Sequence, residues 1–211
     1  MLHAGLVLEE LKKCGVGCVA GLPDNSSAAL IALLEKDDSI RYVSVTREGE
    51  AFAVVSGFWM GGGEAAVLVQ NTGLLESGDS LRGTAQRMRV PLLCLITYRG
   101  FAKMPGVKAL KQSGGNDREL TAPGTSVKSP LAVAHADIRS KIDRPFDFEP
   151  ELFSDSGVDS AALVTEATLR AWGVPFDFLR SDADLPKISK AFSQAQTESR
   201  PVALLITAEM T

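Results

Sequence analysis

Side chains able to do chemistry follow three short apolar segments of this sequence. They are Pro23, Asp24 and Asn25 after the first segment, Arg47, Glu48 and Glu50 after the second, and Gln70, Asn71 and Thr72 after the third. If the segments are parallel strands, these residues meet at the carboxyl edge of one sheet, where open α/β sheets bind their ligands. A carboxylate at such an edge can exchange a proton with a ligand, while amides and hydroxyls orient it.

Each of these residues also has an ordinary structural explanation. Asn71 with Gly73 can form a turn that satisfies its own backbone, and a residue within 25–27 can cap a following helix. Glu50 can lie in the first turn of a helix, where the helix dipole favours a carboxylate. Glu48 can be a solvated or ion-paired residue at a strand end. The residue types therefore leave both explanations open.

The elements that must position these residues alternate between strands and helices. Predicted strands cover residues 16–20, 41–45, 65–69, 91–97, 175–179 and 202–207. Predicted helices cover 5–13, 28–35, the small-residue run from Glu48 to the glycines at 61–63, 77–88, 161–172 and 185–197. Continuous apolar strands are typical of a parallel sheet that is covered on both faces. The pattern predicts an α/β fold, a three-layer open parallel sheet with helices on both faces.

Residues from about 102 to 156 depart from this alternation. They are rich in Gly, Pro, Lys and Asp, with scattered apolar residues. Loops of this length in a compact domain are usually functional or disordered. We expect one domain over 1–211 that carries an irregular insertion, which acts as a lid or a partner-binding arm or is partly disordered.

Composition excludes several classes of protein. The chain has 211 residues, 45% of them hydrophobic, and a formal net charge of -4. A surface that follows nucleic acid or an anionic membrane needs clustered Lys and Arg, so neither partner is expected. No apolar run reaches the roughly 18 residues of a membrane span. The first residues form an amphipathic helix pattern without the features of a signal peptide.

The cysteines indicate a reducing compartment. Cys14, Cys18 and Cys94 are odd in number and have no paired spacing, which argues against a disulfide framework. Small buried side chains explain them better than a metal site, since no His lies near Cys14 or Cys18. We expect a cytoplasmic protein in which this chain supplies no metal ligands.

Four motifs in register resemble the pyrimidine-binding (PYR) domains of thiamine diphosphate (ThDP)-dependent decarboxylases. They are Gly21-Leu22-Pro23-Asp24, Arg47-Glu48-Gly49-Glu50, Val69-Gln70-Asn71-Thr72-Gly73, and Pro91-Leu92-Leu93 continuing to Tyr98-Arg99-Gly100. The resemblance covers about 5–101 and 160–207. It is strongest to the alpha subunit of the sulfopyruvate decarboxylases and the matching half of the phosphonopyruvate decarboxylases, and it implies the PYR-domain fold.

The resemblance implies a catalytic role for Glu48. In this family a Glu at a strand end hydrogen-bonds N1′ of the aminopyrimidine and favours the tautomer that takes the C2 proton of the cofactor. The nine residues from Glu48 to Gly57 favour Glu48 over Glu50 for this place. The turns 23–25 and 70–72 are then expected to contact the cofactor.

A missing motif implies a partner. The family's diphosphate-binding domain carries Gly-Asp-Gly and a later Asn, which hold Mg²⁺ and through it the diphosphate. No Gly-Asp-Gly occurs in this chain. The resemblance thus implies an alpha-type subunit that shares ThDP with a separate beta-type subunit holding the Mg²⁺, and a PYR–PYR homodimer within a larger oligomer.

The implied substrate is a small anionic 2-oxoacid such as sulfopyruvate or phosphonopyruvate. The guanidinium forks of Arg47 and Arg99 suit a tetrahedral oxyanion, although either residue can instead form a structural ion pair. Two other functions stay open. The chain can be a catalytically inactive PYR-like binding or regulatory protein, or a subunit of another ThDP carboligase or synthase. A nucleotide-binding enzyme is disfavoured, since no Gly-x-Gly-x-x-Gly follows a strand.

Overall fold

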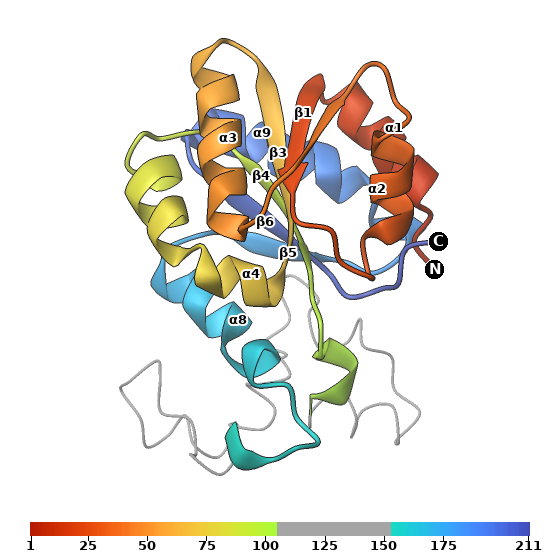
Figure 1. Cartoon of the computed structure of the whole chain (residues 1–211), viewed down its shortest axis with the longest axis vertical. Helices are drawn as coiled ribbons and strands as arrows, with labels where there is room; N and C mark the ends of the chain where they lie inside the picture. The colour runs from red at the N-terminus through yellow and green to blue at the C-terminus, as the bar shows by residue number, and fades with distance from the viewer. Residues whose placement is uncertain (105–152) are drawn as a thin grey trace. The chain divides into compact units, whose positions relative to one another are not determined.

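The computed structural model describes residues 1–104 and 153–211, and within them six parallel strands form one sheet in the order β2-β1-β3-β4-β6-β5 (Figure 1). The strands are β1 Val16–Gly21, β2 Arg41–Ser44, β3 Glu64–Gln70, β4 Leu93–Thr97, β5 Phe176–Leu179 and β6 Val202–Ile206. Three of the four inner strands, β3, β4 and β6, are apolar almost throughout and buried. Such continuous runs form because both faces of a parallel strand are covered.

The chain divides into two compact units, Met1–Tyr98 with Trp172–Thr211, and Arg99–Ala171. The first unit holds the sheet and the helices α1 Ala4–Lys13, α2 Ala28–Leu34, α3 Glu48–Met60, α4 Asn71–Glu76, the π-helix η1 Ser80–Gln86, the short η4 Asp182–Asp184 and α9 Pro186–Glu198. The second unit holds η2 Phe101–Lys103 and α8 Ser160–Ala171. No helix of the described residues is long and apolar enough to cross a membrane.

Alternate side chains of β3, β4 and β6 in the first unit belong to one apolar layer, and the side chains between them face the other side of the sheet. Ala66 and Leu68 of β3, with Leu93 and Leu95 of β4, belong to the core that α1, α2 and α9 cover. Helix α3 packs instead with β1, β3, α4 and η1, and its buried Phe52 contributes to that second layer. The predicted three-layer α/β fold with an open parallel sheet is confirmed.

The segment after β3 differs from its prediction. Asn71-Thr72-Gly73 was expected to form a turn before a helix over 77–88, but α4 begins directly at Asn71 and the π-helix η1 follows it. The direct start of α4 lets Gly73 lie in a helical turn. Gly78 separates the two helical segments where the Trp172 ring packs, since a Cβ on Gly78 would lie 2.9 Å from that ring.

The predicted insertion at 102–156 lies mostly outside the described residues, which omit 105–152. Its expected role as a lid or a partner arm stays a prediction, as does the single domain over 1–211. In the sequence, η2 precedes these residues, and the residues that lead to α8 follow them.

We expect Leu95→Ala to lower the free energy of unfolding by about 2–5 kcal/mol, because it opens a cavity in the buried centre of β4. Urea denaturation followed by circular dichroism measures this loss. Leu6→Ala on α1 is the control, since Leu6 is 45% exposed and little apolar contact is lost there. Equal losses for the two variants would contradict the assigned core.

Candidate functional site

The carboxyl ends of β1, β3 and β4 lie beside one another because the three strands are parallel neighbours. Gly21 of β1 is in register with Leu68 of β3, and Gln70 at the end of β3 is in register with Thr97 of β4. The segments that follow these strands therefore start at one edge of the sheet. This edge is the candidate site.

Asp24 holds the segment after β1 in place. Its Oδ1 accepts the Ser26 N–H at 2.7 Å, and its Oδ2 accepts the hydroxyls of Ser27 at 2.6 Å and Thr97 at 3.2 Å. Ser27 occupies the N-cap position of α2, but its hydroxyl bonds Asp24 rather than the helix backbone. The cap expected from within 25–27 is thus replaced by an Asp24-centred turn.

The other residues predicted at this edge differ in exposure. Pro23 and Asn25 are exposed, whereas Asn71 is fully buried at the start of α4. The Thr72 hydroxyl donates to Gln70 Oε1 at 2.8 Å, which ties the end of β3 to the first turn of α4. The structure brings both predicted segments to one edge, and their contact with a cofactor stays a prediction.

Glu48 is the first residue of α3 and lies against Gly73 of α4. A methyl group on Gly73 would overlap Cγ and Cδ of Glu48 and lie 2.5 Å from its Oε1. The Glu48 side chain is half-buried, and it makes no hydrogen bond or ion pair with the residues of the two described ranges. Its carboxylate is therefore held by packing while its oxygens stay available to a ligand.

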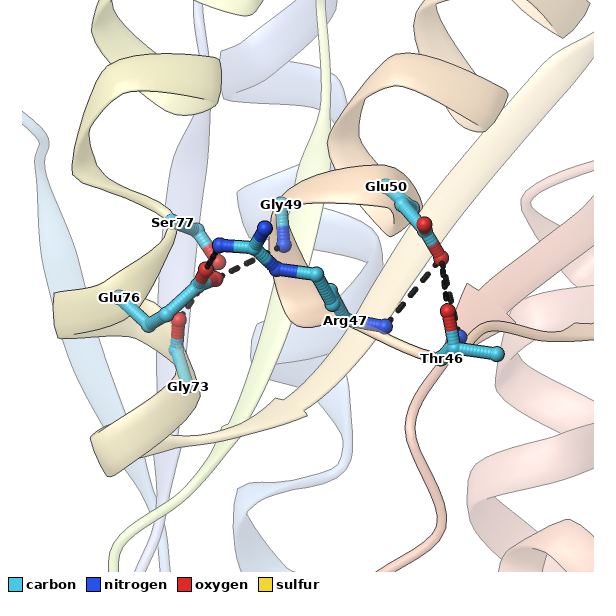
Figure 2. Close-up of polar contacts among 7 residues, drawn as sticks. All are labelled: Thr46, Arg47, Gly49, Glu50, Gly73, Glu76 and Ser77. Carbon is cyan, nitrogen blue, oxygen red and sulfur yellow. Dashed lines mark hydrogen bonds and ion pairs between the residues drawn. The ribbon is translucent and has the colours of Figure 1, made fainter.

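Glu50 is placed differently from Glu48 (Figure 2). One of its oxygens accepts the Thr46 N–H and the Thr46 hydroxyl at 3.0 Å each and the Arg47 N–H at 3.2 Å. These bonds lower the pKa of the Glu50 carboxyl below its ordinary value, the backbone bond from Thr46 most. Glu50 thus caps the start of α3, as the helix-turn explanation expects.

Both arginines that were predicted to meet a substrate anion are in ion pairs. Arg47 Nη2 lies 2.6 Å from Glu76 Oε1 (Figure 2). In the second unit, Arg99 Nε lies 2.9 Å from Asp159 Oδ2. Both contacts are the structural ion pairs that the sequence left open as an alternative. A direct role in substrate binding stays a prediction.

Glu76 was not among the predicted site residues. Besides Arg47, it accepts the Gly49 N–H at 3.2 Å through Oε2. The pKa of the Glu76 carboxyl is lowered, mainly by the hydrogen bond from the Arg47 guanidinium. Its partners lie 27 and 29 positions away in the sequence, so no local spacing signal marks it.

The described residues of the site offer a carboxylate to a polar ring atom of an organic ligand. Glu48 offers a half-buried carboxylate to a polar ring atom, and Gly73 leaves the room that the Glu48 side chain needs. No group of three or more His, Cys, Asp or Glu side chains within 1–104 and 153–211 is arranged to hold a metal ion. The described residues therefore fit the pyrimidine end of ThDP, and the place of its metal and diphosphate stays a prediction.

The family described as thiamine pyrophosphate enzyme, N-terminal TPP binding domain, matches residues 1–115 of this chain. The match includes Glu48, Gly73 and Glu76. It also includes the candidate residues at the ends of β1 and β3.

Two curated proteins illustrate the similarity. The phosphonopyruvate decarboxylase of Streptomyces hygroscopicus is 38% identical over 108 residues, which are 51% of this chain and 26% of that protein. The sulfopyruvate decarboxylase subunit alpha of Methanocaldococcus jannaschii is 29% identical over 97 residues, which are 46% of this chain and 57% of that protein. The chain thus spans about a quarter of the first relative and somewhat over half of the second.

Among solved structures, the benzoylformate decarboxylase of Polynucleobacter necessarius superimposes with a TM-score of 0.52 at 17% sequence identity. The superposition covers 98% of this chain and 30% of that chain. At this identity the likeness concerns the fold, and it confirms the predicted fold class.

We expect Gly73→Ala to be more destabilising when Glu48 is present than in a Glu48→Ala background, because the new methyl displaces the Glu48 side chain. The two effects on the free energy of unfolding should differ by about 0.5–3 kcal/mol. Urea denaturation of the four chains of this double-mutant cycle measures the coupling. Gly57→Ala on α3 is the matched control, since a Cβ there meets nothing within 4 Å. It should stabilise the chain in either background. Coupling within experimental error of zero would show that Glu48 does not lie over Gly73.

The Glu50 cap predicts a pH dependence. Because the pKa of Glu50 is lowered on folding from its ordinary value of 4.5, its stabilising effect is present above that value and is lost as the pH falls through the lower folded pKa. The difference in unfolding free energy between the natural chain and Glu50→Gln should shrink as the pH falls from about 6 to about 3. Denaturant titrations across this range measure it. A difference that is constant with pH would contradict the cap.

Proposed function

This chain belongs to the thiamine pyrophosphate enzymes that share the N-terminal TPP binding domain, and from that premise we propose that it is the pyrimidine-binding, alpha-type subunit of a ThDP-dependent 2-oxoacid decarboxylase. The proposal is supported by the names of its relatives, a phosphonopyruvate decarboxylase and a sulfopyruvate decarboxylase subunit alpha. The activity of a whole enzyme goes beyond the part of those relatives that this chain spans.

The observation that carries the proposal is the state of the Glu48 carboxylate. Neighbouring carboxylates are engaged within the chain, Glu50 by the backbone and Glu76 by Arg47 and Gly49. Glu48 is held against Gly73 with its oxygens unengaged by the described residues. A carboxylate so placed can hydrogen-bond a ring nitrogen of the aminopyrimidine and pass a proton to or from it. When bound, ThDP supplies the electron sink for decarboxylation.

The segments after β1 and β3 are the further candidates for cofactor contact. Gln70, Asn71 and Thr72 form the junction between β3 and α4, on the helix that also carries Gly73. In the β1 segment, Pro23 and Asn25 are exposed, and Asp24 acts by holding the loop, since its carboxylate already accepts three hydrogen bonds. These residues orient the pyrimidine end and exclude water from Glu48.

The remaining parts of the active site belong to a partner in this proposal. A beta-type subunit supplies the Gly-Asp-Gly motif that this sequence lacks, and with it the Mg²⁺ and the diphosphate anchor. The name of one relative, sulfopyruvate decarboxylase subunit alpha, supports such a division. A homodimer of PYR domains within a larger oligomer and a cytoplasmic location complete the proposal.

The proposed substrate is a small anionic 2-oxoacid such as sulfopyruvate or phosphonopyruvate. Arg47 and Arg99 are the candidate ligands of its anionic group. Each is paired with a carboxylate, Arg47 with Glu76 and Arg99 with Asp159. Either arginine would therefore have to exchange or share that carboxylate to bind a substrate.

The proposal is tested by co-expressing the chain with a beta-type subunit that carries the Gly-Asp-Gly motif. The purified complex should bind ThDP in the presence of Mg²⁺ and release CO₂ from one or more 2-oxoacids. Glu48→Gln should lower turnover by about 100-fold or more, the usual contribution of a proton-transferring side chain. Glu50→Gln is the matched control and should keep turnover within about threefold, since Glu50 acts on the helix start.

Two results would contradict the proposal. A complex that binds ThDP but turns over normally with Glu48→Gln would remove Glu48 from the chemistry. A well-folded complex that binds no ThDP would show that the chain does not form a ThDP site, and it would favour a binding or regulatory role.

A further inference from the structure

Glu76 bonds the chain on both sides of Glu48. Its Oε1 lies 2.6 Å from Arg47 Nη2, and its Oε2 accepts the Gly49 N–H at 3.2 Å (Figure 2). Arg47 and Gly49 are the residues immediately before and after Glu48. One carboxylate on α4 therefore holds the start of α3 at two points.

Helix α4 also contacts the Glu48 side chain directly. Gly73, three residues before Glu76, faces the Glu48 side chain. The buried Ser77 hydroxyl donates to the Gly73 carbonyl at 2.5 Å and so fixes this turn of α4. Helix α4 thus provides both the surface on which Glu48 rests and the carboxylate that holds its neighbours.

The approach of the two helices is close at Gly49 as well. A Cβ on Gly49 would lie 3.0 Å from Ser80 Oγ and 3.6 Å from Glu76 Oε2. Two glycines, Gly49 on α3 and Gly73 on α4, therefore let the helices come near enough for the Glu76 contacts to form.

We propose that Glu76 is a positioning residue that, through Arg47 and Gly49, fixes the Glu48 carboxylate at the pyrimidine site. The inference rests on the proposed function of Glu48. It links the start of α3 to α4, whose first residues are candidate cofactor contacts. In this role Arg47 contacts Glu76 rather than a ligand, and it helps to position Glu48 through that contact.

The energetics favour a positioning role over a role in global stability. Arg47 and Glu76 have side chains that are 73% and 38% exposed, and exposed ion pairs contribute little to stability. The bond to the Gly49 N–H, in contrast, satisfies a donor in the first helical turn that has no partner within the helix. Its loss leaves the fold intact and lets the first turn of α3 move. Small displacements of a catalytic group are costly, since about 1 Å can reduce turnover by about 100-fold.

The charges around Glu48 are consistent with this role. Arg47 neutralises Glu76, and Glu50 is bonded to the backbone on the other side of the helix start (Figure 2). The Arg47 contact keeps the pKa of Glu76 low, so the contact persists at neutral pH. Glu76 therefore holds its neighbours as an ionised group and does not itself exchange a proton.

The test compares Glu76→Ala, Glu76→Gln and Glu198→Ala in the full chain and in its complex. Glu198 is the matched control, because it pairs with Arg200 and its side chain is 37% exposed, nearly the same as that of Glu76. In the free chain, hydrogen exchange of the Gly49 amide should be about tenfold faster in Glu76→Ala and unchanged in Glu198→Ala. Glu76→Gln keeps an oxygen for the Gly49 N–H and should restore most of the protection.

In the complex, Glu76→Ala should lower kcat by about 10- to 100-fold while the KM for the 2-oxoacid changes less than threefold. Glu76→Gln should recover much of this loss. Unchanged Gly49 exchange in Glu76→Ala, or full turnover of Glu76→Ala in a complex that Glu48→Gln inactivates, would overturn the inference and leave the proposed function standing. Full turnover of Glu48→Gln would instead refute the proposed function, whatever the exchange data show. If Glu76→Ala fails to fold, Glu76→Met takes its place, because Met is a good helix former that offers no carboxylate oxygen to the Gly49 N–H. Normal Gly49 exchange with normal turnover in Glu76→Met would overturn the inference.

Discussion

Helices α3 and α4 start at the carboxyl ends of β2 and β3, and they come so close that the Glu48 side chain fills the place where a Cβ on Gly73 would lie. The parallel sheet makes this approach possible, because it brings the ends of its strands to one edge. Because Gly73 has no side chain, Glu48 gains a support there without a polar partner among the described residues. The contacts of Gly49 and Glu76 follow from the same approach.

The distribution of hydrogen bonds then separates carboxylates that have the same chemistry. Asp24 holds a loop, Glu50 caps a helix through one of its oxygens, and Glu76 joins two helices, so each of these carboxylates is held by hydrogen bonds within the chain. Glu48 instead rests on Gly73, and no residue of 1–104 or 153–211 bonds its oxygens. A group that must exchange a proton with a bound ring needs this combination of fixed position and unoccupied oxygens. The assignment of Glu48 over Glu50, first favoured by spacing, thereby acquires a physical reason.

The strands and most helices could be predicted because their signals are local. The apolar run at 65–69 marks β3, which the structure extends to Glu64–Gln70. The segment Asn71-Thr72-Gly73 was misjudged, because its turn-forming residues serve as the first turn of a helix. The partners of Arg47 and the role of Glu76 could not be predicted, since they depend on two helices meeting across about thirty residues of sequence. Local patterns thus predicted the frame of the site, while tertiary contacts decide which carboxylate is available.

The central claim is that Glu48 faces the pyrimidine ring of a cofactor shared with a partner subunit. A crystal structure of the complex with ThDP and Mg²⁺ measures this directly. The account predicts a Glu48 carboxylate oxygen within about 2.6–3.2 Å of a pyrimidine ring nitrogen, with Gly73 behind it and the diphosphate held by the partner. A cofactor whose ring nitrogen is bonded by Glu50 or by a residue of the partner, with Glu48 more than about 4 Å away, would contradict it.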